Sequence, residues 1–175
     1  TDQSSGLMPG KWKFHGHMGN YIDRISEQRI LDEKNWDTIY PEIEKAFELR
    51  EDDKNYPDLG RWRGEFWGKY MLSVVAAARY YESEELKTRI AKAVDGFLQH
   101  QEENGYLGTY QHSGFVIGNN WNVWCRKYTL WGLLECYDLL GDEKILTAAQ
   151  QFADHLISEV GPDTTDIVKT GNFYG

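Results

Sequence analysis

The chain has 175 residues, which is the size of one domain or of a piece of a larger one. Its 41% hydrophobic and 27% charged residues are typical of a globular protein rather than a disordered one. The net charge of −9, without any basic cluster, argues against binding to nucleic acid or to a membrane surface, because both require cationic surface. No apolar run approaches the roughly 18 residues of a membrane span. The first ten residues lack a signal-peptide pattern, so we expect that any signal peptide was removed or never existed, which fits a cytoplasmic or an exported protein.

The apolar pattern predicts an all-α fold. We expect residues 1–35 to be an irregular, glycine-rich N-terminal segment and residues 36–175 to form one helical domain. Ser83 and Asp142 are expected N-caps, and Gly141 is an expected helix stop. The expected helices span residues 36–50, 65–81, 84–103, 122–140 and 143–160.

The helices repeat with a period of 59 residues. The apolar stripe that begins with Leu86 and Ile90 recurs as Ile145 and Ala149. Each repeat is a helical hairpin plus a long loop, and such hairpins must stack on neighbours to bury their apolar faces. The stack is either a fragment of a closed toroid, a ring completed by a partner, or an open array.

The two helices of each hairpin differ in pattern. Residues 65–81 and 122–140 are apolar most of the way round, which indicates inner helices. Residues 84–103 and 143–160 carry one apolar stripe against a charged face, which indicates outer helices. The long aromatic loops lead from an outer helix into an inner one. They therefore gather at one rim, where we expect a pocket.

Three sequence blocks, with their order and spacing, resemble the β-L-arabinofuranosidase family, glycoside hydrolase family 127 and its relatives. The blocks are residues 64–70 (GEFWGKY), 104–110 (NGYLGTY) and 121–132 (WNVWCRKYTLWG), and the resemblance covers about residues 36–175. The chain departs from the family pattern at Cys125, where a small residue is expected. The resemblance implies an (α/α)6 toroid, of which about three of six hairpins are present here. It also implies a retaining glycosidase that removes terminal L-arabinofuranose or a related sugar from plant glycans.

The resemblance further implies a zinc-bound cysteine nucleophile and a glutamate acid/base in the full-length enzyme. In the family these groups lie beyond the position of Gly175, so we expect no catalytic residue, no metal ligand and no bound cofactor in this chain, and no activity of this chain alone. Cys125 and Cys136 are about 16 Å apart if they share a helix, too far for a disulfide. Cys136 is expected to be a buried core residue. Cys125 lies near a helix N-terminus, which can lower the pKa of a thiol and leaves its reactivity open.

Candidate substrate-binding residues gather at the start of the second inner helix. Trp121, Trp124 and Tyr128 share one helical face, and they form either packed core or a platform for stacking sugars. Two adjacent cations at a helix N-terminus oppose its dipole, so Arg126 is expected either to bind substrate or to pair with an acid. Tyr106 joins this group from the preceding loop.

The first hairpin contributes Glu65 and Lys69 at the same rim, either as weaker substrate-binding candidates or as a simple helix salt bridge. Lys69 is the counterpart of Tyr128 under the shift of 59, so both side chains should project toward one axis. His100 and His155 are expected on polar helix surfaces.

The leading hypothesis is therefore a carbohydrate-active hydrolase with a glycan or small sugar as its partner. A second hypothesis is an unsaturated uronyl hydrolase, another helical toroid, which needs catalytic aspartates on inner helices. Only Asp138, near a helix C-terminus, is available for that role. A third is a non-catalytic helical repeat that binds sugar or protein. An incomplete ring would also expose apolar surface at its open ends, so we expect self-association.

Overall fold

The computed structural model of the chain describes residues 11–50, 63–110 and 120–166. These residues are helical or in turns, and their only β pairing is an isolated bridge between Val160 and Thr165, so the all-α prediction is confirmed. None of the helices in these ranges is long and apolar enough to cross a membrane. The elements are α1 (Gly16–Ile25), η1 (Ser26–Ile30), η2 (Asn35–Ile39), α2 (Tyr40–Leu49), α3 (Arg63–Tyr81), α4 (Glu84–Phe97), η3 (Leu98–His100), α5 (Asn120–Leu140) and α6 (Glu143–Glu159).

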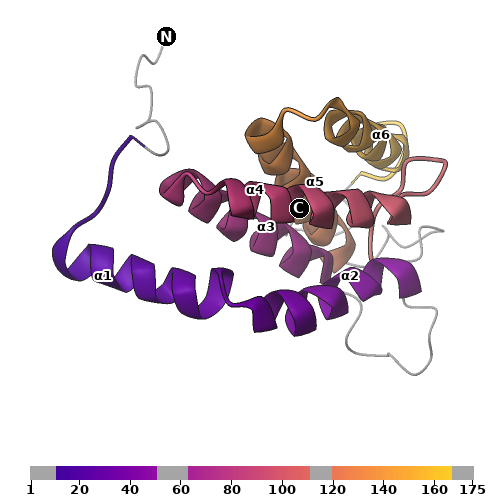
Figure 1. Cartoon of the computed structure of the whole chain (residues 1–175). Coiled ribbons are helices and arrows are strands. Elements are labelled where there is room, and N and C mark those ends of the chain that lie inside the picture. The colour runs from indigo at the N-terminus through magenta and orange to yellow at the C-terminus, as the bar shows by residue number, and fades with distance from the viewer. Residues whose placement is uncertain (1–10, 51–62, 111–119, 167–175) are drawn as a thin grey trace, which may run out of the picture.

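Two helical hairpins, α3–α4 and α5–α6, form the centre of the molecule. The two predicted inner helices, α3 and α5, make the most extensive helix–helix contact, and each also contacts its own outer helix. Figure 1 shows α1 and α2 along one side of the α3–α4 hairpin, with α5 and α6 on the other side. This is the arrangement of helical hairpins from which (α/α) toroids are built.

Caps and turns set the helix boundaries close to the predicted ones. The Ser83 hydroxyl accepts a hydrogen bond from the Leu86 N–H at 3.2 Å and starts α4, and Asp142 caps α6 through the Lys144 N–H at 3.0 Å. The second helix of the first hairpin ends at His100 rather than at the predicted residue 103. It stops there because the Glu102 N–H bonds to the Tyr106 carbonyl, which turns the chain into the loop.

The glycine-rich sequence had indicated an irregular N-terminal segment. This prediction is wrong for residues 16–30, which are helical. Ile22, Ile25 and Ile30 line an open apolar groove against α3, and the Tyr81 hydroxyl of α3 donates a hydrogen bond to the Asp23 carboxylate of α1 at 2.8 Å. Gly19 allows the close approach of the Phe14 backbone, since a Cβ at this position would lie 2.9 Å from the Phe14 carbonyl carbon. The glycines therefore permit this helix rather than interrupt it.

An aromatic cluster fills the core between α2, α3 and α4. The Trp67 and Phe97 rings stack with their centroids 3.7 Å apart, and Phe47 meets Phe97 edge-on at 4.6 Å. All three side chains are fully buried. The cluster fixes the first hairpin against α2 and so positions the start of α3.

The contact between α3 and α5 depends on two glycines. A Cβ at Gly68 would lie 2.9 Å from the Tyr128 Cβ and closer still to the Tyr128 carbonyl group. At Gly132 it would lie 3.0 Å from the Gly68 Cα. The two inner helices can approach this closely only because neither residue carries a side chain. This approach places the N-terminal parts of α3 and α5 side by side.

Candidate functional site

The first half of α5 carries a row of aromatic side chains, Trp124, Tyr128 and Trp131. The Trp124 and Tyr128 rings meet at 5.3 Å with an angle of 62°, and Tyr128 stacks with Trp131 at 6.1 Å and 16°. Trp131 is 49% exposed. Sequence reasoning had missed Trp131 as a site residue, although its spacing of 3 from Tyr128 could have shown it. The prediction for Trp121 concerns a side chain outside the described residues.

Two lysines lie beside these rings. The Lys69 ammonium is 4.8 Å from the Tyr128 ring centroid, which confirms that the two side chains project toward one axis. The Lys127 ammonium is 3.6 Å from the Trp124 centroid and 5.1 Å from that of Tyr128. We call these residues the rim cluster: Lys69, Trp124, Lys127, Tyr128 and Trp131.

Glu65 and Lys69 form the predicted salt bridge along α3. The hydrogen bond with Glu65 raises the pKa of Lys69 above its usual value, so the ammonium stays charged. The Lys69 side chain is exposed, whereas Glu65 is largely covered. The Lys69 ammonium of this pair therefore lies on the exposed side, next to the Tyr128 ring.

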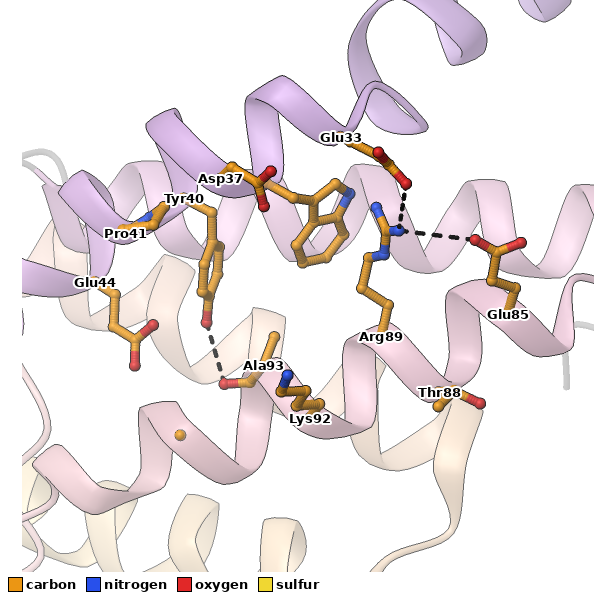
Figure 2. A pocket seen from close by; sticks show the side chains of 12 residues that line it. Glu33, Asp37, Tyr40, Pro41, Glu44, Glu85, Thr88, Arg89, Lys92 and Ala93 are labelled. Carbon is orange, nitrogen blue, oxygen red and sulfur yellow. Dashed lines mark hydrogen bonds and ion pairs between the residues drawn. The ribbon is translucent and has the colours of Figure 1, made fainter.

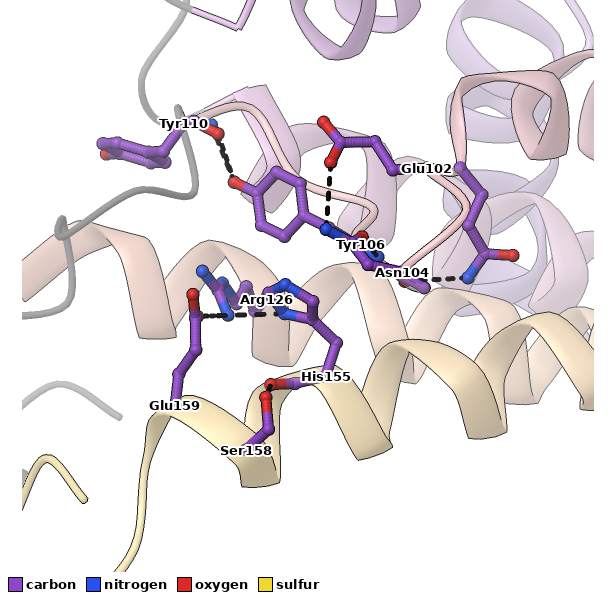
Figure 3. A network of polar contacts seen from close by, with 10 residues as sticks. Glu102, Asn104, Tyr106, Tyr110, Arg126, His155, Ser158 and Glu159 are labelled. Atoms are coloured by element: carbon purple, nitrogen blue, oxygen red, sulfur yellow. Dashed lines mark hydrogen bonds and ion pairs between the residues drawn. The ribbon is translucent and has the colours of Figure 1, made fainter.

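Arg126 points toward Glu159 of α6, as Figure 3 shows. The side chain is 2% exposed, and its Nη1 donates to the Glu159 carboxylate of α6 at 2.5 Å. Its guanidinium lies 4.8 Å from the Tyr106 ring centroid. Of the two roles that the sequence left open for Arg126, the structure shows pairing with an acid.

Tyr106 is also buried, which departs from the sugar contact expected of it. Its hydroxyl donates to the Tyr110 carbonyl and accepts the Tyr110 N–H at 3.2 Å, and its ring lies 5.1 Å from that of His155 (Figure 3). Burial raises the pKa of Tyr106 to about 12. The physical reason is the loop at residues 101–110, which folds back onto α6 and covers these side chains.

The sequence had indicated that His155 lies on a polar helix surface. In the structure it belongs to this interior network instead. Its side chain is 8% exposed, and its Nδ1 lies 3.8 Å from the Glu159 carboxylate. The residue lies one turn before Glu159 on the face of α6 that the loop covers. Tyr106, Arg126, His155 and Glu159 thus hold the loop, α5 and α6 together beneath the rim.

Both cysteines are free and buried. Cys136 lies in the core as predicted. Cys125 lies against Gly64 of α3, and burial raises its pKa from an ordinary value of 9.0 to about 12. Desolvation therefore outweighs the helix-terminus effect that had left its reactivity open. Burial likewise raises the pKa of Cys136 to about 12.

We expect neither thiol to react in the folded protein. At pH 8 a thiol-specific disulfide reagent should modify both cysteines only after unfolding in urea. Because the unfolded chain releases these protons first, stability should fall as pH rises from about 9 toward 12. Rapid modification of one thiol in the native protein, at the rate of a free cysteine, would contradict this account.

The described residues do not fit the zinc site that the family resemblance implies. A cysteine zinc site needs three or four ligands, whereas the chain contains only two cysteines, both buried. Within the described ranges, no group of three His, Cys, Asp or Glu side chains is placed to hold a metal ion.

A second hollow, an open groove of about 800 Å³, lies between α2 and α4 (Figure 2). Several of its charged groups form ion pairs with each other, since Arg89 lies 3.8 Å from Glu33 and 3.7 Å from Glu85. Trp36 and Tyr40 form its floor but are buried, so they offer little ring surface. The rim cluster is therefore the stronger candidate site.

A sequence model of the β-L-arabinofuranosidase catalytic domain, glycoside hydrolase family 127, matches residues 16–175. Searches of curated proteins and of solved structures find no match to the chain.

Proposed function

The chain belongs to the β-L-arabinofuranosidase catalytic-domain family, glycoside hydrolase family 127, and on this basis we propose that its rim cluster forms one wall of the sugar-binding site of a retaining glycosidase. The substrate class is glycans that end in L-arabinofuranose or a related sugar. The observation that carries the proposal is the aromatic row of α5, which is exposed at Trp131 and lies beside the start of α3.

The rim cluster has the chemistry that sugar binding needs. Trp124 and Tyr128 supply flat rings that can cover the apolar face of a furanose with little loss of side-chain entropy. The Glu65–Lys69 pair supplies an acceptor and a donor for hydroxyl groups. Arg126 and Tyr106 act indirectly in this proposal, because their buried contacts hold the start of α5 and the loop in position.

Retention of configuration requires a nucleophile that forms a covalent intermediate and an acid/base that protonates the leaving group. In the proposal these groups, and the zinc implied by the family resemblance, come from outside the described residues of this chain. The described residues bind and orient the sugar. We therefore expect the 175-residue chain to release no arabinose by itself.

The test uses alanine variants of the full-length enzyme. Trp124→Ala and Tyr128→Ala should each lower kcat/KM about 5- to 150-fold, the loss expected for contacts worth roughly 1–3 kcal/mol. Tyr21→Ala, which removes a half-exposed ring from α1, should leave kcat/KM unchanged. If both site variants fold normally and keep kcat/KM within about twofold, the aromatic row is scaffold and the proposal fails.

The structure argues against the uronyl hydrolase hypothesis, because Asp138, its candidate catalytic residue, is paired with Arg79. The Asp138 carboxylate accepts a hydrogen bond from Arg79 of α3 at 2.5 Å, near the C-terminal end of α5 and away from the rim cluster. Arg79 also pairs with Glu135 at 2.6 Å. These contacts give Asp138 a role in joining the two inner helices.

The second hairpin also carries exposed apolar side chains outside the rim cluster, namely Leu134 and Ile157. Neighbouring hairpins would cover such residues in a complete toroid. We therefore expect the chain to self-associate at high concentration, and sedimentation velocity should show species larger than a monomer. A sharp monomer boundary at millimolar concentration would contradict this expectation.

A further inference from the structure

The rim cluster contains two lysines and no acidic residue, in a chain whose net charge is −9. Glu159 neutralises Arg126, and Glu65 pairs with Lys69. Among the described residues, no carboxylate lies within ion-pair distance of Lys127, whose ammonium lies instead over the Trp124 and Tyr128 rings.

The Lys127 ammonium lies over the ring that the proposed site offers to a sugar. At 3.6 Å from the Trp124 centroid, it occupies one ring face. A neutral sugar that stacks on that face must displace the ammonium and offers no charge in return. A sugar with a carboxylate beside its ring would stack on Trp124 and also give the displaced ammonium an ion-pair partner.

From this geometry we infer that the rim cluster selects sugars that carry a carboxylate, with Lys127 as the specificity-determining residue. Lys69, whose ammonium lies 4.8 Å from the Tyr128 centroid, places a second ammonium on the same surface, where it is paired with Glu65. The inference rests on the proposed sugar site and narrows its substrate class to glycans with an acidic residue at this position.

The test compares two ligands that differ only in the carboxylate: methyl β-L-arabinofuranoside and the uronate formed by oxidising its C5 hydroxymethyl group. Titrations of the 175-residue chain, followed by the NMR shifts of the tryptophan indole N–H groups, should show at least fivefold tighter binding of the uronate at low salt. High salt should reduce this preference. Lys127→Gln should abolish the preference for the uronate, and Lys69→Gln should reduce it. Lys144→Gln, which removes an exposed lysine near the start of α6, is the matched control and should preserve it.

The outcomes separate the inference from the proposed function. Equal affinity for the two ligands, or an unchanged preference in Lys127→Gln, overturns the inference and leaves the sugar site standing. Absence of binding for both ligands overturns both. Acetate that reproduces the uronate shifts at the same concentration would reveal a simple anion site and would also overturn the inference.

Discussion

Replacing Gly68 with alanine should cost the chain about 3 kcal/mol of folding free energy or more, which is at the upper end for overpacking. The added methyl group would lie 2.9 Å from the Tyr128 Cβ and would collide with the Tyr128 backbone carbonyl. Backbone cannot rotate aside as a flexible side chain can, so α3 and α5 would have to separate. Urea denaturation followed by circular dichroism at 222 nm measures the loss.

Gly96→Ala is the matched control for this prediction. Gly96 also lies inside a helix, α4, but a Cβ there meets only the Glu44 carboxylate, at an ordinary distance of 3.5 Å. The higher helix propensity of alanine should leave stability unchanged or raise it by up to about 1 kcal/mol. Equal effects of the two substitutions would show that α3 and α5 do not approach as described.

Removing Arg126 should have the second large effect on stability. Arg126→Ala leaves Glu159 without its guanidinium partner and removes the cation from the Tyr106 ring, beneath a loop that excludes water. Breaking a buried ion pair by deleting one partner costs about 3–5 kcal/mol. Because Glu159 is partly exposed, we expect a value at the low end of that range, measured by urea denaturation.

The control for Arg126 is an exposed ion pair. Lys87→Ala breaks the pair with Glu84 on the surface of α4, where such pairs contribute about 0–1 kcal/mol. If Arg126→Ala proves no more costly than Lys87→Ala, the network beneath the rim does not hold α5 and α6 together. A stable Arg126→Ala variant with low kcat/KM would instead indicate that Arg126 contacts the sugar directly.

The helices could be predicted because their signals are local. Amphipathic stripes, the caps at Ser83 and Asp142, and the repeat at 59 residues placed each predicted helix within a few residues of its observed bounds. Helix α1 was missed because Gly16 and Gly19 were interpreted as breakers. Its contacts with α3, such as the hydrogen bond from the Tyr81 hydroxyl to Asp23, join residues 58 apart in the sequence and leave no local signal.

The candidate site was predictable only in part. Trp124 and Tyr128 are four residues apart and share a face, whereas Arg126 is two residues from each and must point elsewhere on a helix. Helical geometry alone could therefore have separated Arg126 from the aromatic row. The burial of Tyr106 and His155 could not be predicted in this way, because it depends on how the loop at residues 101–110 folds onto α6.

The most direct test of the sugar site is the response of individual tryptophans to methyl β-L-arabinofuranoside. In a titration of the chain followed by the indole N–H signals, Trp124 and Trp131 should shift in a saturable manner. Trp67, which is fully buried in the core, should not move. Shifts that spare Trp124, or that appear equally at Trp67, would contradict the account.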